Sequence, residues 1–177
     1  TVVRATLGVR DRYLGPQPGV PVTNQAQYRV ALRTRLAVDR AGRFALVAGA
    51  STGARFVGAW NRTGVGTGDR ESHPWLKHLY VTAGVRQGMT VDAGGLDVRN
   101  GMATDLTGLA GDGYLMGGRG RLATSALPLV DEAMLTVGHL GDLRQPSVFR
   151  RLRRLDEVNY GRLILAHHGR HVGISAD

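Results

Sequence analysis

The clearest pattern in the sequence is a strict alternation of apolar and polar positions over residues 27–39. A helix would scatter the apolar positions around its circumference, whereas a strand points successive side chains to opposite faces. One face would carry Tyr28, Val30, Leu32, Thr34, Leu36 and Val38, and the other Gln27, Arg29, Ala31, Arg33, Arg35, Ala37 and Asp39. The predicted strand exceeds the ~5–6 residues usual in globular proteins and matches the ~9–11 that cross a bilayer.

The same pattern recurs along the chain as hairpins. A short turn at 39–43 joins the first strand to a second at 43–51, which predicts a hairpin over 27–51. Further strands are predicted at 75–85, 89–98, 113–123 and 131–140, with weaker patterning at 2–13, 159–167 and 171–175. We therefore predict an all-β chain of about eight or nine antiparallel strands in a single domain, 1–177.

The connections between these strands differ in length in a regular way. Those near 40–42, 86–88 and 124–128 are short, whereas those at 52–73, 99–112 and 141–158 are long and rich in Gly, Asp, Asn and Arg. Short turns at one end and long loops at the other are typical of an outer-membrane β-barrel. A soluble meander has no reason to sort its loops in this way.

One long connection contains a helical pattern. Apolar residues from Val148 to Val158 recur at helix-like spacing, with arginines between them. We interpret this as a short loop helix that packs Phe149 and Leu152 against the protein. The alternative is a basic amphipathic element on an anionic surface.

Composition narrows the class further. The chain has 26 glycines but only 6 prolines, which suits the tight turns of a β protein. The net charge is +9, and nearly all the positive charges are arginines spread along the chain. This indicates either a coding bias or a preference for anions. The lack of cysteine excludes disulfides and thiolate metal sites. No run approaches the ~18 apolar residues of a membrane helix.

Candidate catalytic chemistry is sparse. Residues 49–53 match the G-x-S-x-G nucleophile elbow around Ser51, but the Gly-rich residues that follow are poor helix formers. We expect Ser51 to be chemically ordinary. Neither the histidines nor the carboxylates show a catalytic or metal-ligand spacing. The sequence therefore predicts no enzyme, no cofactor and no metal.

A Gly-Arg cluster at 117–121 invites an RNA-binding interpretation. It lies within a predicted strand, however, so we expect no nucleic-acid partner.

Several stretches together carry a family resemblance. They are residues 60–68, 75–81, 94–96, 112–117 and 148–152. In these the chain resembles a little-characterised group of Gram-negative outer-membrane β-barrel, porin-like proteins, from about residue 26 to the end. Such barrels usually finish on a strand with a terminal aromatic residue, which this chain lacks. The resemblance thus implies a fragment without its C-terminal strands.

Taken together, these features predict part or all of a porin-like barrel in the bacterial outer membrane. Lipid would contact the apolar face of residues 28–38, and Arg29, Arg33 and Arg35 would line the lumen and favour small anionic solutes. The rival is a soluble β-sandwich or barrel that binds a polyanion through its Arg-rich strand faces. A serine hydrolase using Ser51 is a third, weaker alternative. The sequence leaves the solute and the oligomeric state open.

Overall fold

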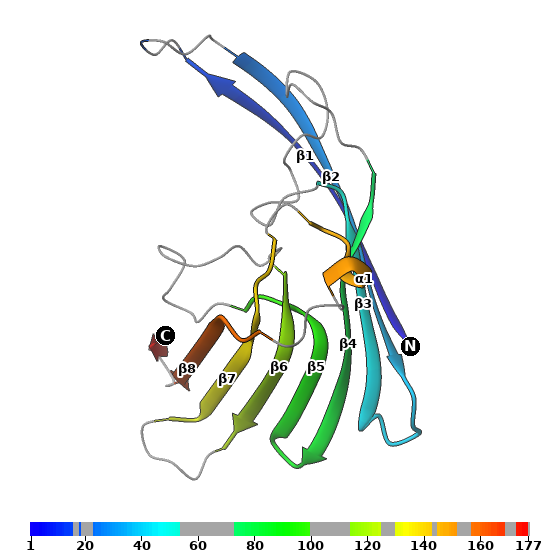
Figure 1. Ribbon diagram of the computed structural model, residues 1–177, viewed down its shortest axis with the longest axis vertical. Coiled ribbons are helices and arrows are strands. Elements are labelled where there is room, and N and C mark those ends of the chain that lie inside the picture. The colour runs from blue at the N-terminus through cyan, green and yellow to red at the C-terminus, as the bar shows by residue number, and fades with distance from the viewer. Residues whose placement is uncertain are drawn as a thin grey trace.

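The protein is a single antiparallel β-sheet whose strands follow one another in chain order (Figure 1). The computed structural model describes residues 1–15, 18, 23–53, 73–99, 114–124, 130–142, 145–151, 157–168 and 173–176. The strands are β1 (Val2–Leu14), β2 (Thr23–Ala37), β3 (Phe44–Ser51), β4 (Trp75–Arg86), β5 (Met89–Asp97), β6 (Tyr114–Ala123), β7 (Glu132–His139), β8 (Tyr160–His168) and β9 (Gly173–Ala176). The all-β prediction and the hairpin predicted over 27–51 are confirmed. The strands predicted at 75–85 and 89–98, and those at 113–123 and 131–140, also pair as hairpins.

The connections are sorted between the two edges of the sheet. Because each strand pairs antiparallel with the next, successive connections leave alternately from two edges of the sheet, each formed by the ends of the strands. The links at 38–43, 87–88 and 124–131 lie at one edge, which we call the turn edge. The links at 52–74, 98–113 and 140–159 start and end at the opposite edge, the loop edge. The predicted alternation of short and long connections is therefore confirmed in length and in position.

Local chemistry fixes the turns. Gly42 and Gly88 have φ of 67° and 75°, a left-handed conformation that glycine adopts without steric cost. In the first turn the N–H of Phe44 donates to Asp39 Oδ1 at 2.7 Å. This hydrogen bond lowers the pKa of the Asp39 carboxyl below its ordinary value. The turn residues thus set the register of the hairpin between β2 and β3.

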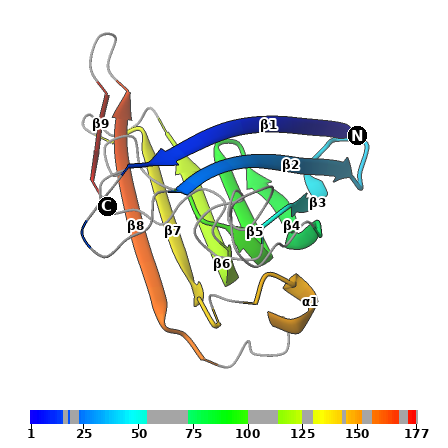
Figure 2. The same ribbon diagram turned by 90° about the horizontal axis from the view of Figure 1, so that it is seen from above.

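The sheet is curved, and its two faces are unlike. Arg33 of β2 forms an ion pair of 3.0 Å with Asp97 of β5. Neighbouring strands lie about 4.8 Å apart, so β2 and β5 would be about 14 Å apart across a flat sheet. The ion pair therefore requires the sheet to bend toward the side that carries Arg33. We call this side the inner face and the other the outer face; Figure 2 shows the strands wrapping around the inner side.

The sheet is not closed into a barrel. β1 and β9 stand at the two ends of the strand order, and each pairs with only one neighbour among the described residues. The curvature is compatible with part of a barrel. A complete ring would need the free sides of β1 and β9 to be joined, because an unpaired outermost strand exposes backbone N–H and C=O groups.

A small apolar cluster lies among β3, β4, β5 and β6. It contains Val47, Tyr80, Leu96, Val98, Tyr114 and Leu115, with Leu140 and Tyr160 packed against it. This cluster is modest for a chain of this length. Most of the large aliphatic side chains of the strands lie elsewhere, on the outer face.

The predicted loop helix exists as a single turn, α1 (Val148–Arg151). The expectation that Phe149 packs against the protein is wrong, because its side chain is 59% exposed. Val148 and Arg151 are buried instead. The Arg151 guanidinium lies 3.9 Å from the centre of the Tyr114 ring, and burial lowers its pKa to about 10. Leu152 lies outside the described residues.

Candidate functional site

The outer face is apolar and exposed. The register places the side chain of every second strand residue on this face, and many of these side chains are large and hydrophobic. Their exposed fractions run from 36% to 76%. They are Val3, Leu7, Val9 and Tyr13 of β1, Val30, Leu32 and Leu36 of β2, Phe44 of β3, Val81 of β4, Val91 of β5, Leu135 and Val137 of β7, and Leu163 and Leu165 of β8.

This distribution is the reverse of a water-soluble sheet, which buries its apolar face and exposes its polar one. The exposed apolar surface runs across several strands rather than occurring as scattered single residues, and such a surface marks an interaction with another apolar phase. Asp11 and Arg86 also fall on the outer face by register, and each lies near the end of its strand.

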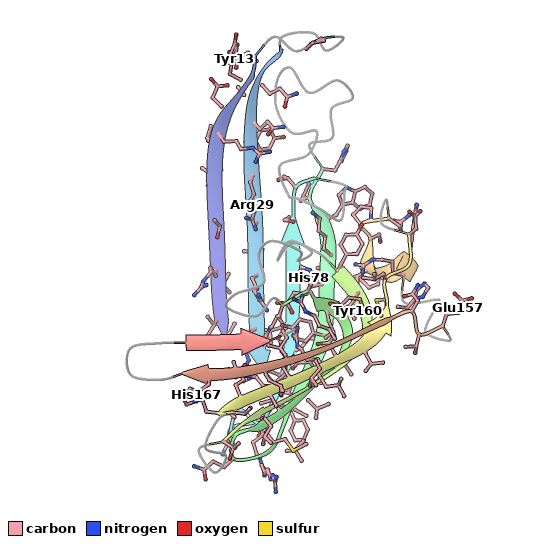
Figure 3. All side chains as sticks on the ribbon, turned by 90° about the vertical axis from the view of Figure 1, so that its left-hand side faces the viewer. Tyr13, Arg29, His78, Glu157, Tyr160 and His167 are labelled. Carbon is pink, nitrogen blue, oxygen red and sulfur yellow. The ribbon has the colours of Figure 1, made fainter. Side chains whose placement is uncertain are left out.

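The inner face carries the charge. Registers from β1 to β8 place the following side chains on one face: Arg4, Arg10, Arg29, Arg33, Arg35, Asp92, Arg119, Arg121, Glu132 and Arg162. Arginines outnumber carboxylates in this set. Figure 3 labels one of these side chains, Arg29 on β2.

The three arginines predicted to share one face do so. Arg33 donates to the Tyr80 hydroxyl at 2.7 Å and to Asp97 Oδ2 at 3.0 Å, so a carboxylate balances its charge. Arg35 is exposed and, with Arg121, lines a hollow of about 210 Å³. Arg29 lines a second hollow on the same face. All three thus lie on the concave side of the sheet, with Arg29 and Arg35 at different hollows.

A buried ion-pair network lies at the centre of the inner face. Arg119 donates to Asp92 Oδ2 at 2.7 Å and to Asp97 Oδ1 at 3.0 Å, and its side chain is almost inaccessible. Asp97 also accepts from Arg33, so the network joins β2, β5 and β6. Charges buried this deeply are tolerated only when they are paired and hydrogen-bonded. The network therefore holds the inner wall in one arrangement.

Sequence reasoning missed Asp92, Asp97 and Arg119. The sequence does contain a signal for the pair of Asp92 and Arg119, because both are polar positions in strands with an alternating pattern. Antiparallel pairing sets them directly opposite each other. Finding it required the exact register of β5 against β6, which the Gly-rich segments at 94–95 and 117–118 leave weakly specified. The structure confirms that the Gly-Arg cluster at 117–121 lies in a strand.

Ser51 ends β3 on the inner face and is 8% exposed. The segment that would have to form the helix of a nucleophile elbow, from residue 54 onward, lies outside the described residues. That Ser51 is chemically ordinary therefore stays a prediction, and the hydrolase alternative stays untested. Within the described ranges, no three histidine, cysteine or carboxylate side chains gather as a metal site would require.

Comparison with protein-family models, with curated proteins and with solved structures returns no match for this chain. In the described part, no helix is both long and apolar enough to cross a membrane. The two unlike faces of the sheet are the feature of this chain that bears on its function.

Proposed function

We propose that this chain forms part or all of a porin-like β-barrel in the outer membrane of a Gram-negative bacterium. In this proposal lipid covers the outer face, and the inner face lines a passage for small solutes with a preference for anions. The chain performs no catalysis and needs no cofactor for this role.

One observation carries the proposal: the apolar face of the sheet points outward and is exposed, while the charged side chains point inward. In lipid, a spanning structure must satisfy every backbone polar group internally, which curved antiparallel sheets achieve once closed. An apolar outside and a polar inside is the arrangement that such a barrel requires. The sorting of short and long connections between the two edges supports the same proposal.

The soluble rival, a β-sandwich or barrel that binds a polyanion, needs the apolar face to be covered. A sandwich would do this with a second sheet packed about 10 Å away. The described strands all belong to one sheet, and none of them forms a second sheet over the outer face. Among the described residues these hydrophobic side chains are exposed, so the soluble rival needs a further cover for them. The membrane proposal accounts for this face without any further component.

The proposal is tested by folding the chain from denaturant into detergent micelles and into liposomes. We expect strand-rich circular dichroism only when detergent or lipid is present, and flotation of the protein with the liposomes after an alkaline wash. Planar-bilayer recordings should then show discrete conductance steps.

A monodisperse, folded, detergent-free protein that does not float with liposomes would contradict the membrane role. Stable insertion without conductance would retain the barrel and remove the passage. In that case the inner face would be a closed, structural interior.

A further inference from the structure

We infer that the inner face holds a specific oxyanion-binding site in the hollow between β1, β2, β3 and β4. The inference deepens the proposed function and rests on it only for the biological role, since the hollow itself is a property of the sheet. It names one place where a carboxylate or phosphate group is held.

The first wall of the hollow is a row of basic side chains across the strands. Arg4 of β1 stands directly opposite Arg33 of β2, Arg33 stands opposite Gly49 of β3, and Gly49 stands opposite His78 of β4. Like charges directly opposite each other destabilise an antiparallel pair. Asp97 offsets part of this repulsion through Arg33, and an anion between the two guanidinium groups would offset the rest.

The floor of the hollow is built from small side chains. The next row on the same face contains Thr6, Ala31 and Ser51, paired across β1, β2 and β3. In the basic row Gly49 has no side chain, and a Cβ there would come within 2.9 Å of His78 Nδ1. The small residues leave a space of about 190 Å³ between longer basic side chains.

The second wall is Arg29, which follows in the row beyond the floor, opposite Gly8. Three arginines, one histidine and two hydroxyls therefore line one hollow. No carboxylate is found among its described lining residues, whereas the neighbouring hollow beside Arg35 contains Asp92. Arg33 is balanced by Asp97, and Arg4 makes no ion pair with any described residue, so the described part of the lining carries an excess of positive charge.

Guanidinium groups and hydroxyls are the donors that recognise carboxylate and phosphate oxygens, and arginine does so with paired N–H groups. The size of the hollow suits a small organic anion or a single phosphate group rather than a polymer. The lining thus selects an oxyanion, and its position on the inner face exposes it to solutes rather than to lipid.

The site is tested on the full chain folded in detergent micelles, by calorimetric titration with inorganic phosphate and, separately, with acetate at constant ionic strength. We expect saturable binding of at least one anion, and the tighter of the two identifies phosphate or carboxylate as the preferred group. Arg4→Gln should weaken it by about tenfold or more, because a charge-assisted contact is lost. Arg40→Gln, which removes the same charge from the exposed turn at 38–43, should change it by less than about twofold.

A second variant separates loss of the site from loss of the fold. Ala31→Asp places a carboxylate on the floor, where it should take the place of the anion. We expect this variant to lose phosphate and acetate binding and to unfold at a higher temperature than the parent chain. Absence of saturable binding in the folded parent, or equal effects of Arg4→Gln and Arg40→Gln, would overturn the site.

The titration does not depend on insertion or conductance, so the two proposals fail separately. Anion binding by a protein that never inserts would leave the site standing and remove the membrane role. Insertion and conductance without saturable binding would do the reverse.

Discussion

Gly94 and Gly120 are two strand glycines with opposite requirements. Gly94 has a φ of +129°, and a Cβ there would lie 2.6 Å from the carbonyl oxygen of Leu79. Gly120 faces outward, and nothing lies within 4 Å of the position its Cβ would take. The same residue type is thus demanded by the backbone at one position and merely permitted at the other.

From this difference we predict unequal effects of alanine. Gly94→Ala should lower the free energy of unfolding by about 1–3 kcal/mol, because it combines a strained φ with a backbone clash. Gly120→Ala should be nearly neutral. Urea titrations of the protein folded in micelles measure both, and equal effects would contradict the local geometry described for β5.

Two arginines two residues apart on β6 give a second prediction. Arg119 is buried between Asp92 and Asp97, whereas Arg121 is 41% exposed and pairs with Glu132. Arg119→Gln should cost about 3–5 kcal/mol, because it leaves two carboxylates without their shared buried partner. Arg121→Gln should cost about 0–1 kcal/mol, as for an exposed ion pair. Denaturant unfolding in micelles distinguishes the two, and a small effect at Arg119 would rule out a structural role for the network.

On the scale of a single strand, β4 carries the contrast between the two faces at neighbouring positions. Val81 lies on the outer face and is 49% exposed, whereas Thr82 lies on the inner face opposite Asp92. The membrane proposal therefore assigns Val81 to lipid and Thr82 to the interior.

We predict that Val81→Arg impairs insertion and Thr82→Arg does not. A guanidinium on the lipid-facing side near the bilayer midplane costs about 2–4 kcal/mol. At residue 82 the same group meets the carboxylate of Asp92. The fraction of protein that floats with liposomes after folding measures the difference. If the two variants insert equally well, the outer face is not the lipid face.

For the whole molecule, the excess of inner-face arginines determines the expected selectivity. A passage lined by the positive charges of Arg29, Arg33 and Arg35 should attract anions and repel cations. We predict anion preference in planar bilayers at low salt that weakens as salt rises, because the Debye length falls from ~10 Å at 0.1 M to ~3 Å at 1 M.

Replacing these three arginines together with glutamine should reduce the anion preference without preventing insertion. Reversal potentials under a salt gradient measure the change. Arg33 also anchors Asp97, so the single variants Arg29→Gln and Arg35→Gln serve as controls that leave the ion-pair network intact. Cation preference in the unmodified protein would exclude the anion passage.

The sequence alone determined the strands, their order as hairpins and the unlike faces of β2. These follow from local rules: period-two alternation assigns side chains to faces, and glycine-containing turns fix adjacent pairing. The separation of Arg29, Arg33 and Arg35 from Val30, Leu32 and Leu36 needed no tertiary information.

Only the tertiary structure decided which face is concave, and which charges meet across it. Arg33 and Asp97 lie far apart in sequence and on strands that are not neighbours, so no local pattern predicts their ion pair. The hollow between Arg4, Arg29 and His78 likewise depends on the register of four strands and on small residues at 31 and 49. The reason is physical: alternation fixes the direction of each side chain relative to its own strand, while curvature and register decide what it contacts.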